Sequence, residues 1–373
     1  MEATRSASTA TRRLAEVPSA PLRVVDVALF YGERSGGIRT YLDAKSRYAA
    51  ASGAFEHHAV VPGRRERHDG SRHELRALSV AASNGYRLPL GTGPLEETLR
   101  EIAPDVILVH DPYWALGPAT RVAAERGVPV VAVHHSTVEM DATALRGPTP
   151  LYRRMFRARY RAAYRRVDAV MSVVDPSPDG GRGASLPLRF GIDPAFAPRP
   201  GVARGEHVLY VGRIARVKGV FDLIEAAAGA DWELVFVGSG PAGDALLSTA
   251  KKLRMRDRVS ILPFLADRAE LAAAYAGACC VVVPGRYETF GLAALEAAAS
   301  GARVVVCSST PAAGLIGDLA HRFRPGDADD MSRAIDEARR APTNVFAAAE
   351  LGRRFSWERA FESELADLRG LLR

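Results

Sequence analysis

The stretch VVVPGRYETFGLAALEA, residues 281–297, decides the fold expected for this chain of 373 residues. An apolar run typical of a buried strand ends at Pro284-Gly285, and a helical pattern begins near Phe290. A strand, a glycine turn and a helix in this order form the repeating unit of parallel, doubly wound sheets. The free N–H groups at the start of such a helix, together with its positive dipole end, are suited to a diphosphate. The stretch therefore predicts an anion-binding turn at the edge of a sheet.

Two glutamates eight residues apart, Glu288 and Glu296, accompany this turn. Carboxylates near a diphosphate site can accept hydrogen bonds from ribose or sugar hydroxyls, and Gly291 lets the backbone approach a ligand closely. One interpretation is that the pair binds both ends of a nucleotide sugar. The other is structural, with Glu288 as a helix cap and Glu296 as a solvated helix position. The residues alone leave both interpretations open.

Two further strand ends in the same half carry cations or glycines. The segment LYVGRIARVKG, residues 209–219, predicts a strand followed by a loop that presents Arg213 and Lys218. Cations at the carboxyl end of a parallel strand are well placed for a pyrophosphate, although loop cations are also common surface residues. The segment FVGSGP, residues 236–241, predicts another strand that ends in a glycine turn at Gly238.

The rest of the chain alternates apolar runs with amphipathic segments, which indicates parallel sheets covered by helices on both faces. Strands are expected at 22–30, 57–61, 105–110, 128–134, 168–174, 207–212, 232–238, 259–262, 279–284 and 302–307. The strands fall into two series, so the fold class is α/β with two Rossmann-like domains facing a cleft. The expected boundaries are a disordered tail at 1–21, an N-terminal domain at 22–192, a linker at 193–206, a C-terminal domain at 207–345 and a C-terminal helix at 346–373.

Composition and charge narrow the class of protein. The chain is 47% hydrophobic and 25% charged, as is ordinary for a globular protein. It contains no run of 18 apolar residues, so no membrane-spanning helix is predicted. The first 200 residues hold 28 basic against 21 acidic side chains, whereas the remainder holds 22 of each. The whole net charge of +7 therefore lies in the first half, which favours an anionic ligand or surface there. We expect a cytoplasmic protein, at most peripheral at the inner membrane face, with no nucleic-acid partner.

In order and spacing, these segments resemble glycosyltransferase family 4, also described as glycosyl transferases group 1. Members of that family are retaining enzymes with the GT-B fold. The resemblance covers Val24 to the end and is strongest from 207 to 310. It implies that 22–192 is the acceptor domain and 207–345 the nucleotide-sugar donor domain. The FSWE sequence at 355–358 resembles the family's ending, which implies that the helix at 346–373 returns to the N-terminal domain. The resemblance also implies that Arg213 and Lys218 hold the donor diphosphate and that Glu296 binds the ribose. Glu288 would contact the donor sugar, helped by backbone amides that the resemblance assigns to Phe290, Gly291 and Leu292.

The same resemblance extends to the first half. The segment SGGIRTY at 35–41 resembles the glycine loop that the family places between donor phosphate and acceptor, which assigns Gly36 and Gly37 to the site; the alternative is an ordinary loop before a helix. His110, followed by Asp-Pro, matches a histidine at the reaction centre of related phosphatidylinositol mannosyltransferases, although a histidine at a strand end is often structural. His134 and its neighbours to Thr137 are expected to line the same cleft or to be structural. One departure is Phe190, where many relatives have asparagine.

A basic segment at 151–166 has two interpretations. On a helix, its aromatic residues and its arginines recur at intervals of four and form two adjacent stripes. The aromatic stripe is Tyr152, Phe156, Tyr160 and Tyr164, and the arginine stripe is Arg153, Arg157, Arg161 and Arg165. The helix either lies on an anionic bilayer or holds a phosphorylated acceptor, or it buries its aromatics in the domain and leaves its arginines in water.

The expected reaction is transfer of a hexose from a GDP- or UDP-linked sugar to an acceptor hydroxyl on a lipid or glycan. The family's front-face mechanism implies that the leaving phosphate accepts the proton, so that neither a side-chain nucleophile nor a metal or other cofactor is needed. The sequence has no cluster at metal-ligand spacing. The alternatives are a nonhydrolysing sugar-nucleotide epimerase, a natural-product glycosyltransferase with a soluble acceptor, and a noncatalytic membrane-binding module.

Overall fold

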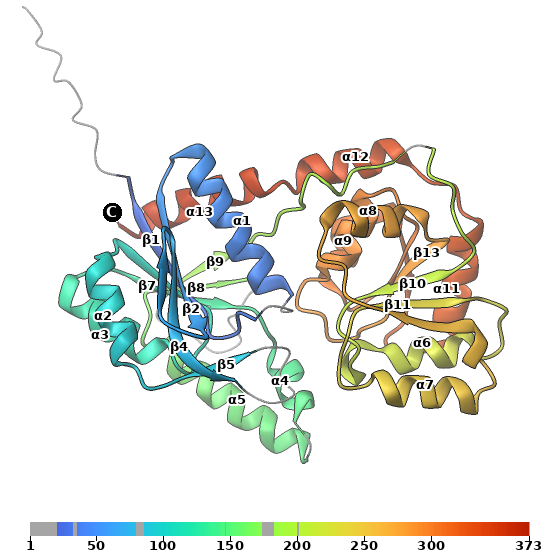
Figure 1. Ribbon diagram of the computed structural model, residues 1–373, viewed down its shortest axis with the longest axis horizontal. Coiled ribbons are helices and arrows are strands. Elements are labelled where there is room, and N and C mark those ends of the chain that lie inside the picture. Colours follow the sequence, from blue (N-terminus) through green and yellow to red (C-terminus); the bar gives the residue numbers. More distant parts are fainter. Residues whose placement is uncertain are drawn as a thin grey trace, which may run out of the picture.

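The structure, a computed structural model, describes residues 21–32, 36–79, 86–145, 147–173, 183–199 and 201–372. The tail predicted at 1–21 lies outside these residues except for Pro21, as do Ser35 of the glycine loop and Pro200 of the predicted linker. The described residues form two α/β halves, each built around its own sheet (Figure 1).

The N-terminal sheet has the strand order β3-β4-β2-β1-β6-β7-β8-β9, with β5 paired to β4. All of its pairs are parallel except β3 with β4 and β4 with β5. The strands are β1 (Arg23–Val27), β2 (Glu56–Gly63), β3 (Arg67–Asp69), β4 (Arg72–Ser79), β5 (Arg87–Pro89), β6 (Val106–Val109), β7 (Val130–His134), β8 (Ala169–Ser172) and β9 (Ala184–Pro187).

The C-terminal sheet is entirely parallel and has the order β12-β11-β10-β13-β14-β15, which is the doubly wound order of a dinucleotide-binding domain. Its strands are β10 (Val208–Val211), β11 (Leu234–Val237), β12 (Val259–Leu262), β13 (Cys280–Val283), β14 (Val304–Cys307) and β15 (Ala320–Phe323). The strand order reverses between β10 and β13, which is where ligands bind in such sheets. The prediction of two doubly wound α/β domains is confirmed.

Helices cover both faces of each sheet, because successive apolar residues of a strand point to opposite sides. Val24 of β1 faces the core that contains the α1 residue Tyr41, whereas Val25 faces the core that contains the α2 residue Leu95. The helices of the N-terminal half are α1 (Gly37–Ser52), α2 (Gly93–Ile102), α3 (Leu116–Arg126), α4 (Val138–Ala144) and α5 (Thr149–Tyr164). Those that follow are α6 (Val220–Ala227), α7 (Gly243–Lys252), α8 (Arg268–Gly277), α9 (Leu292–Ala299), α10 (Pro311–Ile316), α11 (Ala328–Arg340), α12 (Val345–Arg354) and α13 (Trp357–Leu371).

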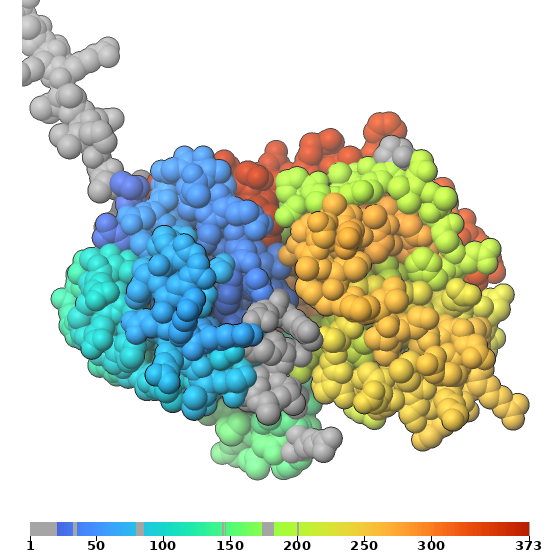
Figure 2. Space-filling view, viewed as in Figure 1, coloured from blue at the N-terminus to red at the C-terminus, as the bar shows by residue number. Residues whose placement is uncertain are grey.

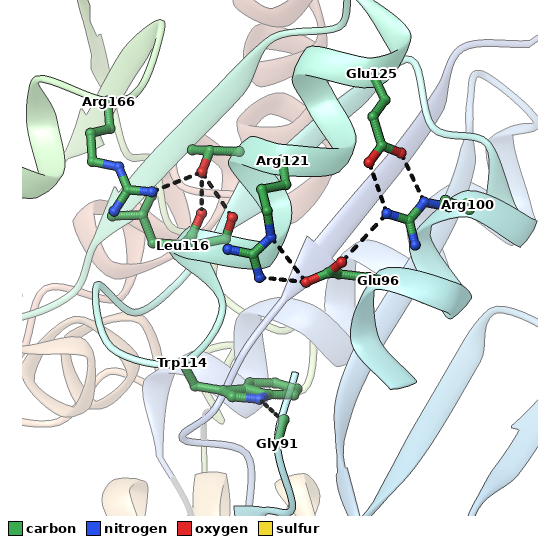
Figure 3. Close-up of polar contacts among 10 residues, drawn as sticks. Gly91, Glu96, Arg100, Trp114, Leu116, Arg121, Glu125 and Arg166 are labelled. Carbon is green, nitrogen blue, oxygen red and sulfur yellow. Dashed lines mark hydrogen bonds and ion pairs between the residues drawn. The ribbon is translucent and has the colours of Figure 1, made fainter. Parts of the chain in front are cut away.

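Helices α2 and α3 lie side by side, and Figure 3 shows the polar contacts that join them. Arg100 of α2 forms a two-point contact with Glu125 of α3, at 2.8 Å for each bond. Glu96 of α2 pairs with Arg121 of α3. The indole N–H of Trp114 donates to the carbonyl of Gly91 at 2.9 Å, which ties the loop before α2 to the loop after β6.

The chain passes between the two halves at two adjacent points. The N–H of Ile192 donates to the carbonyl of Phe355, and Ile192 forms a parallel bridge with Ser356. Gly191 lies so close to Trp357 that an added Cβ would be 2.5 Å from its backbone. Helix α12 packs on α9, and α13 packs on α1 (Figure 1). In Figure 2 the C-terminal helices, in red, run along the upper edge of both halves.

Candidate active site

A cavity of about 250 Å³ lies between the two halves. Its lining residues from the N-terminal half are Phe30, Gly36, Gly37, Ile38, Tyr86, His135 and Phe190, and those from the C-terminal half are Lys218, Glu288, Thr289, Phe290, Gly291 and Leu292. The cavity lies at the carboxyl ends of β10 and β13, where the C-terminal strand order reverses. Four predicted parts of the site therefore line one cavity: the glycine loop at Gly36 and Gly37, the cation Lys218, the carboxylate Glu288 and the start of the helix at Leu292.

Helix α9 begins at this cavity because of the conformation of Gly291. That residue has φ +88°, a left-handed conformation, and a Cβ there would lie 2.4 Å from the side chain of Thr310. Only glycine fits such a position without displacement of its neighbours. The first N–H groups of a helix have no partner within the helix, so the start of α9 presents hydrogen-bond donors to the cavity.

Lys218 and Glu288 meet across the cavity wall. The ammonium of Lys218 lies 2.8 Å from each carboxylate oxygen of Glu288. Lys218 ends the short helical turn η1 (Arg216–Lys218), which Gly219 terminates with φ +69°. A Cβ on Gly219 would lie 2.5 Å from the carbonyl of Pro284, so this glycine brings the Lys218 loop against the turn that precedes Glu288. The pair places a cation and a carboxylate side by side at the cavity wall.

Arg213 lies in the same loop but is not among the residues that line the cavity. Its side chain is exposed, and it forms no ion pair with any residue within the described ranges. Burial raises the pKa of Tyr86, a cavity residue, and the positive charge of Arg213 opposes this shift. Arg213 is thus close enough to act electrostatically on the cavity wall.

Glu296 is buried behind the cavity, with 6% of its surface exposed. The structural alternative of a solvated helix position is therefore wrong. Its carboxylate lies 3.4 Å from Arg268 and 3.4 Å from the hydroxyl of Tyr275. Burial raises the pKa of Glu296 to about 7, although Arg268 and Tyr275 act in the opposite direction. Arg268 also donates to the hydroxyl of Thr40 at 2.9 Å, which connects this glutamate to α1 of the other half.

Gly238 lies outside the residues that form the cavity wall. It has φ +142°, and an added Cβ would be 2.1 Å from the carbonyl of Gly212. Its N–H donates to the carbonyl of Leu262 at 3.0 Å. In this structure Gly238 allows the ends of β10 and β11 to approach each other closely.

The three histidines at the strand ends have different environments. The side chain of His110 has no exposed surface and reaches the cavity only through His135, whose Nε2 lies 2.6 Å from Nδ1 of His110. His135 itself lines the cavity. His134 is turned towards α5, where its Nδ1 meets the hydroxyl of Tyr164 at 2.5 Å, and burial lowers its pKa to about 4.

Two cavity residues that were not predicted as site residues, Thr289 and Phe190, make contacts that join the two halves. The hydroxyl of Thr289 donates to the carbonyl of His135 at 2.8 Å. The rings of Phe190 and Phe290 lie 4.7 Å apart. The sequence signal for this ring contact was Phe190 itself, at the position where many relatives have asparagine. A buried aromatic ring packs against other apolar groups, as Phe190 does here against Phe290.

The basic helix α5 faces the domain with its aromatic stripe. Phe156 and Tyr160 are buried in a cluster with Ala142. Of the predicted arginine stripe, Arg153 is half-buried and pairs with Glu139 at 3.3 Å, so its place in the outward surface was wrong. The exposed arginines are Arg154, Arg157, Arg161 and Arg165. Leu151 and Met155 are also exposed, at 60% and 48%. Packing thus accounts for the aromatic stripe and leaves an outward surface that combines arginines with apolar side chains.

Among the described residues, no helix is long and apolar enough to cross a membrane. Nor do those residues bring together three or more histidine, cysteine, aspartate or glutamate side chains in a way that could hold a metal ion.

Comparison with known proteins identifies the family. Residues 199–349 match the family described as Glycosyl transferases group 1, and residues 35–176 match Glycosyltransferase Family 4. A GDP-mannose-dependent alpha-(1-6)-phosphatidylinositol dimannoside mannosyltransferase from Mycobacterium tuberculosis is 32% identical over 379 residues, which cover 93% of this chain and 96% of that protein. The chain belongs to glycosyltransferase family 4. This glycosyltransferase is also 36% identical over 171 residues to a D-inositol 3-phosphate glycosyltransferase from Mycolicibacterium smegmatis, which covers 43% of this chain and 39% of that one.

Solved structures show the fold of this family 4 glycosyltransferase. Sucrose-phosphate synthase from Thermosynechococcus elongatus superposes with a TM-score of 0.74 at 18% identity, over 94% of this chain and 99% of that one. HepE of Anabaena, solved in complex with UDP and glucose, superposes with a TM-score of 0.69 at 16% identity, over 93% and 99%. The predicted GT-B fold and family are confirmed.

Proposed function

We propose that this glycosyltransferase moves a hexose from a nucleoside diphosphate sugar to an acceptor hydroxyl, with retention at the anomeric carbon. One observation carries the proposal: Lys218, Glu288 and the start of α9 converge on a single cavity between the two halves. A cation and helix N–H groups suit a diphosphate, and a carboxylate suits sugar hydroxyls. The M. tuberculosis relative supports GDP-mannose as the donor and a phosphatidylinositol mannoside as the acceptor.

In this proposal the ion pair between Lys218 and Glu288 is exchanged when the donor binds. Lys218 turns to the diphosphate together with Arg213, and Glu288 turns to the hydroxyls of the sugar. Neutralisation of the departing diphosphate is the main electrostatic task, because negative charge develops there in the transition state. The departing phosphate then accepts the proton of the incoming hydroxyl, so that no side-chain nucleophile is needed. Gly36 and Gly37 give the acceptor close access to the donor phosphate.

The test uses GDP-mannose, UDP-glucose and UDP-galactose, each with phosphatidylinositol mannosides, with soluble inositol phosphate and without an acceptor. We expect mannose transfer from GDP-mannose to the lipid acceptor and an α-anomeric product by NMR. A β-anomeric product would contradict retention, and transfer only to inositol phosphate would point to a soluble acceptor. Conversion of the sugar nucleotide without any acceptor would instead identify an epimerase.

We also propose that turnover needs no metal ion, because Arg213 and Lys218 supply the positive charge that a divalent cation provides elsewhere. The expected result is a kcat that is unchanged by dialysis against EDTA and by added Mg²⁺ or Mn²⁺. Loss of activity in EDTA that Mg²⁺ or Mn²⁺ restores would show that the cations of the loop are not sufficient.

The outward surface of α5 is proposed to meet an anionic membrane that carries the acceptor. Each basic residue near such a surface contributes roughly 1 kcal/mol, so four exposed arginines together contribute roughly 4 kcal/mol to membrane binding. Changing Arg154, Arg157, Arg161 and Arg165 to Gln is expected to abolish co-sedimentation with phosphatidylglycerol vesicles at 0.1 M salt. A variant with Lys251, Lys252, Arg254 and Arg340 changed to Gln removes the same charge elsewhere and should still sediment. Equal sedimentation of both variants would contradict the proposal.

A further inference from the structure

A buried polar network lies behind the cavity in the N-terminal half. Its centre is Asp26 on β1, whose side chain has no exposed surface. One carboxylate oxygen lies 2.7 Å from the ammonium of Lys45 and 2.9 Å from Nε2 of His57, and the other lies 2.7 Å from Nε2 of His110. Burial alone would raise the pKa of Asp26, but Lys45 and the two histidines outweigh it and hold that pKa well below its usual range. Asp26 is therefore an ionised carboxylate inside the domain.

The second carboxylate of the network comes from the other end of the chain. Glu364 on α13 lies 2.7 Å from the ammonium of Lys45 and accepts a hydrogen bond from the hydroxyl of Tyr41 at 2.5 Å. Glu364 is 2% exposed. An uncompensated buried charge is strongly unfavourable, so side chains of this kind persist only with partners. Lys45 has two carboxylate partners, of which Asp26 alone would balance its charge. Glu364 is thus a second carboxylate on a single ammonium group.

The network ends at the cavity through two imidazoles. His110 binds Asp26 with Nε2 and meets His135 with Nδ1, at 2.6 Å, and the planes of the two rings differ by 14°. His135 lines the cavity beside Glu288. A carboxylate that binds one nitrogen of a histidine fixes the tautomer and the orientation of the ring. Because Asp26 holds Nε2 of His110, it also determines that Nδ1 is the nitrogen that faces His135.

We propose that Glu364 is a positioning residue, which acts through Lys45 and Asp26 to set the orientation and proton affinity of the His110–His135 pair at the cavity wall. The C-terminal helix would then complete the active site electrostatically without touching a substrate. The kinetic part of this inference rests on the proposed function, but the geometry of the network does not.

Titratable groups on several elements lie around this histidine pair. They are Asp26 of β1, Tyr41 and Lys45 of α1, His57 of β2, His134 of β7 and Glu364 of α13, together with Lys218 and Glu288 on the cavity side. Burial lowers the pKa of His135 and of His57, and burial raises the pKa of Tyr41. Asp26 opposes the shift at His135, and at His57 Glu364 favours and Lys45 opposes a proton. Replacement of the Glu364 carboxylate by a neutral amide should therefore lower the proton affinity of the histidine pair.

The test compares Glu364→Gln with Glu362→Gln. Glu362 is an exposed glutamate on the same helix and forms no ion pair within the described part of the chain. Two readouts are used: the pH profile of kcat/KM, and titration of the imidazole nitrogens by ¹⁵N NMR. Glu364→Gln is expected to move the histidine-dependent limb and the NMR titration to lower pH by roughly one unit. Glu362→Gln should leave both unchanged.

A second variant separates charge from folding. Lys45→Met with Glu364→Gln removes one charge of each sign and should return the titration towards that of the native chain. The opposite outcome is that the native chain, Glu364→Gln and the double variant titrate at the same pH and differ only in melting temperature. That outcome would show that Glu364 is merely structural. The NMR readout needs no turnover, so it decides the role of Glu364 even if no donor is used and the proposed function fails.

Discussion

Replacement of Lys218 by alanine is expected to lower kcat/KM by a factor of at least about 100, because the loss of one preorganised transition-state donor costs on the order of 3 kcal/mol. Lys218 lines the cavity and is held there by Glu288. Arg213→Ala should have an effect of the same order, since its charge acts on the cavity wall at Tyr86. Steady-state kinetics with a saturating acceptor measure both effects.

Arg216 provides the matched control for this experiment. It lies in the same loop, but its guanidinium stacks on the ring of Phe221 at 4.2 Å and is exposed. Arg216→Ala is expected to keep kcat/KM within about twofold of the native value. A double variant of Arg213 and Lys218 that retains most activity would show that the diphosphate binds elsewhere.

Replacement of Glu296 by glutamine is expected to stabilise the protein at pH 8 while weakening nucleotide binding. Burial raises the pKa of Glu296 in the folded chain from the ordinary value of 4.5 to about 7. A carboxyl whose pKa is raised by folding stabilises the fold fully below the unfolded pKa, and this contribution is lost as the pH rises through 7. The ionised form therefore costs up to about 3 kcal/mol above pH 7.

Thermal unfolding at two pH values measures the first effect, and calorimetric titration with GDP measures the second. Glu296→Gln should melt at a higher temperature than the native chain at pH 8 and at nearly the same temperature at pH 5. GDP should bind roughly 10- to 100-fold more weakly if the carboxylate accepts the ribose hydroxyls. Glu288→Gln is expected to reduce mainly kcat. Lower stability of Glu296→Gln at both pH values, with unchanged GDP affinity, would contradict this assignment.

The sequence predicted the fold because its buried strands are continuous apolar runs. The runs at 105–110 and 279–284 became β6 and β13, since a strand covered on both faces has no polar side to hide the pattern. Strands β3, β4, β5, β9 and β15 were missed because they lack such a run. The sequences RHD, RHELRALS and AHRF of β3, β4 and β15 are largely polar, RLP and ASLP of β5 and β9 are short, and all five strands lie towards the sheet edges.

The site was predicted where local motifs define it and missed where distant segments meet. Lys218, Glu288 and Gly291 lie in motifs whose turns fix their place at the sheet edge. No spacing in the sequence could bring Glu364 to Lys45, which is more than 300 residues away along the chain. The position of His135 in front of His110 likewise depends on the packing of β6 beside β7 and not on any local pattern.

The most direct test of the proposed donor site is a crystal structure of the protein with bound GDP. The account predicts that the diphosphate lies within hydrogen-bond distance of the Lys218 ammonium and of the backbone amides at the start of α9, with the ribose near Glu296. It also predicts that the ion pair between Lys218 and Glu288 is broken. A diphosphate bound away from Lys218 and α9, with that ion pair intact, would contradict it.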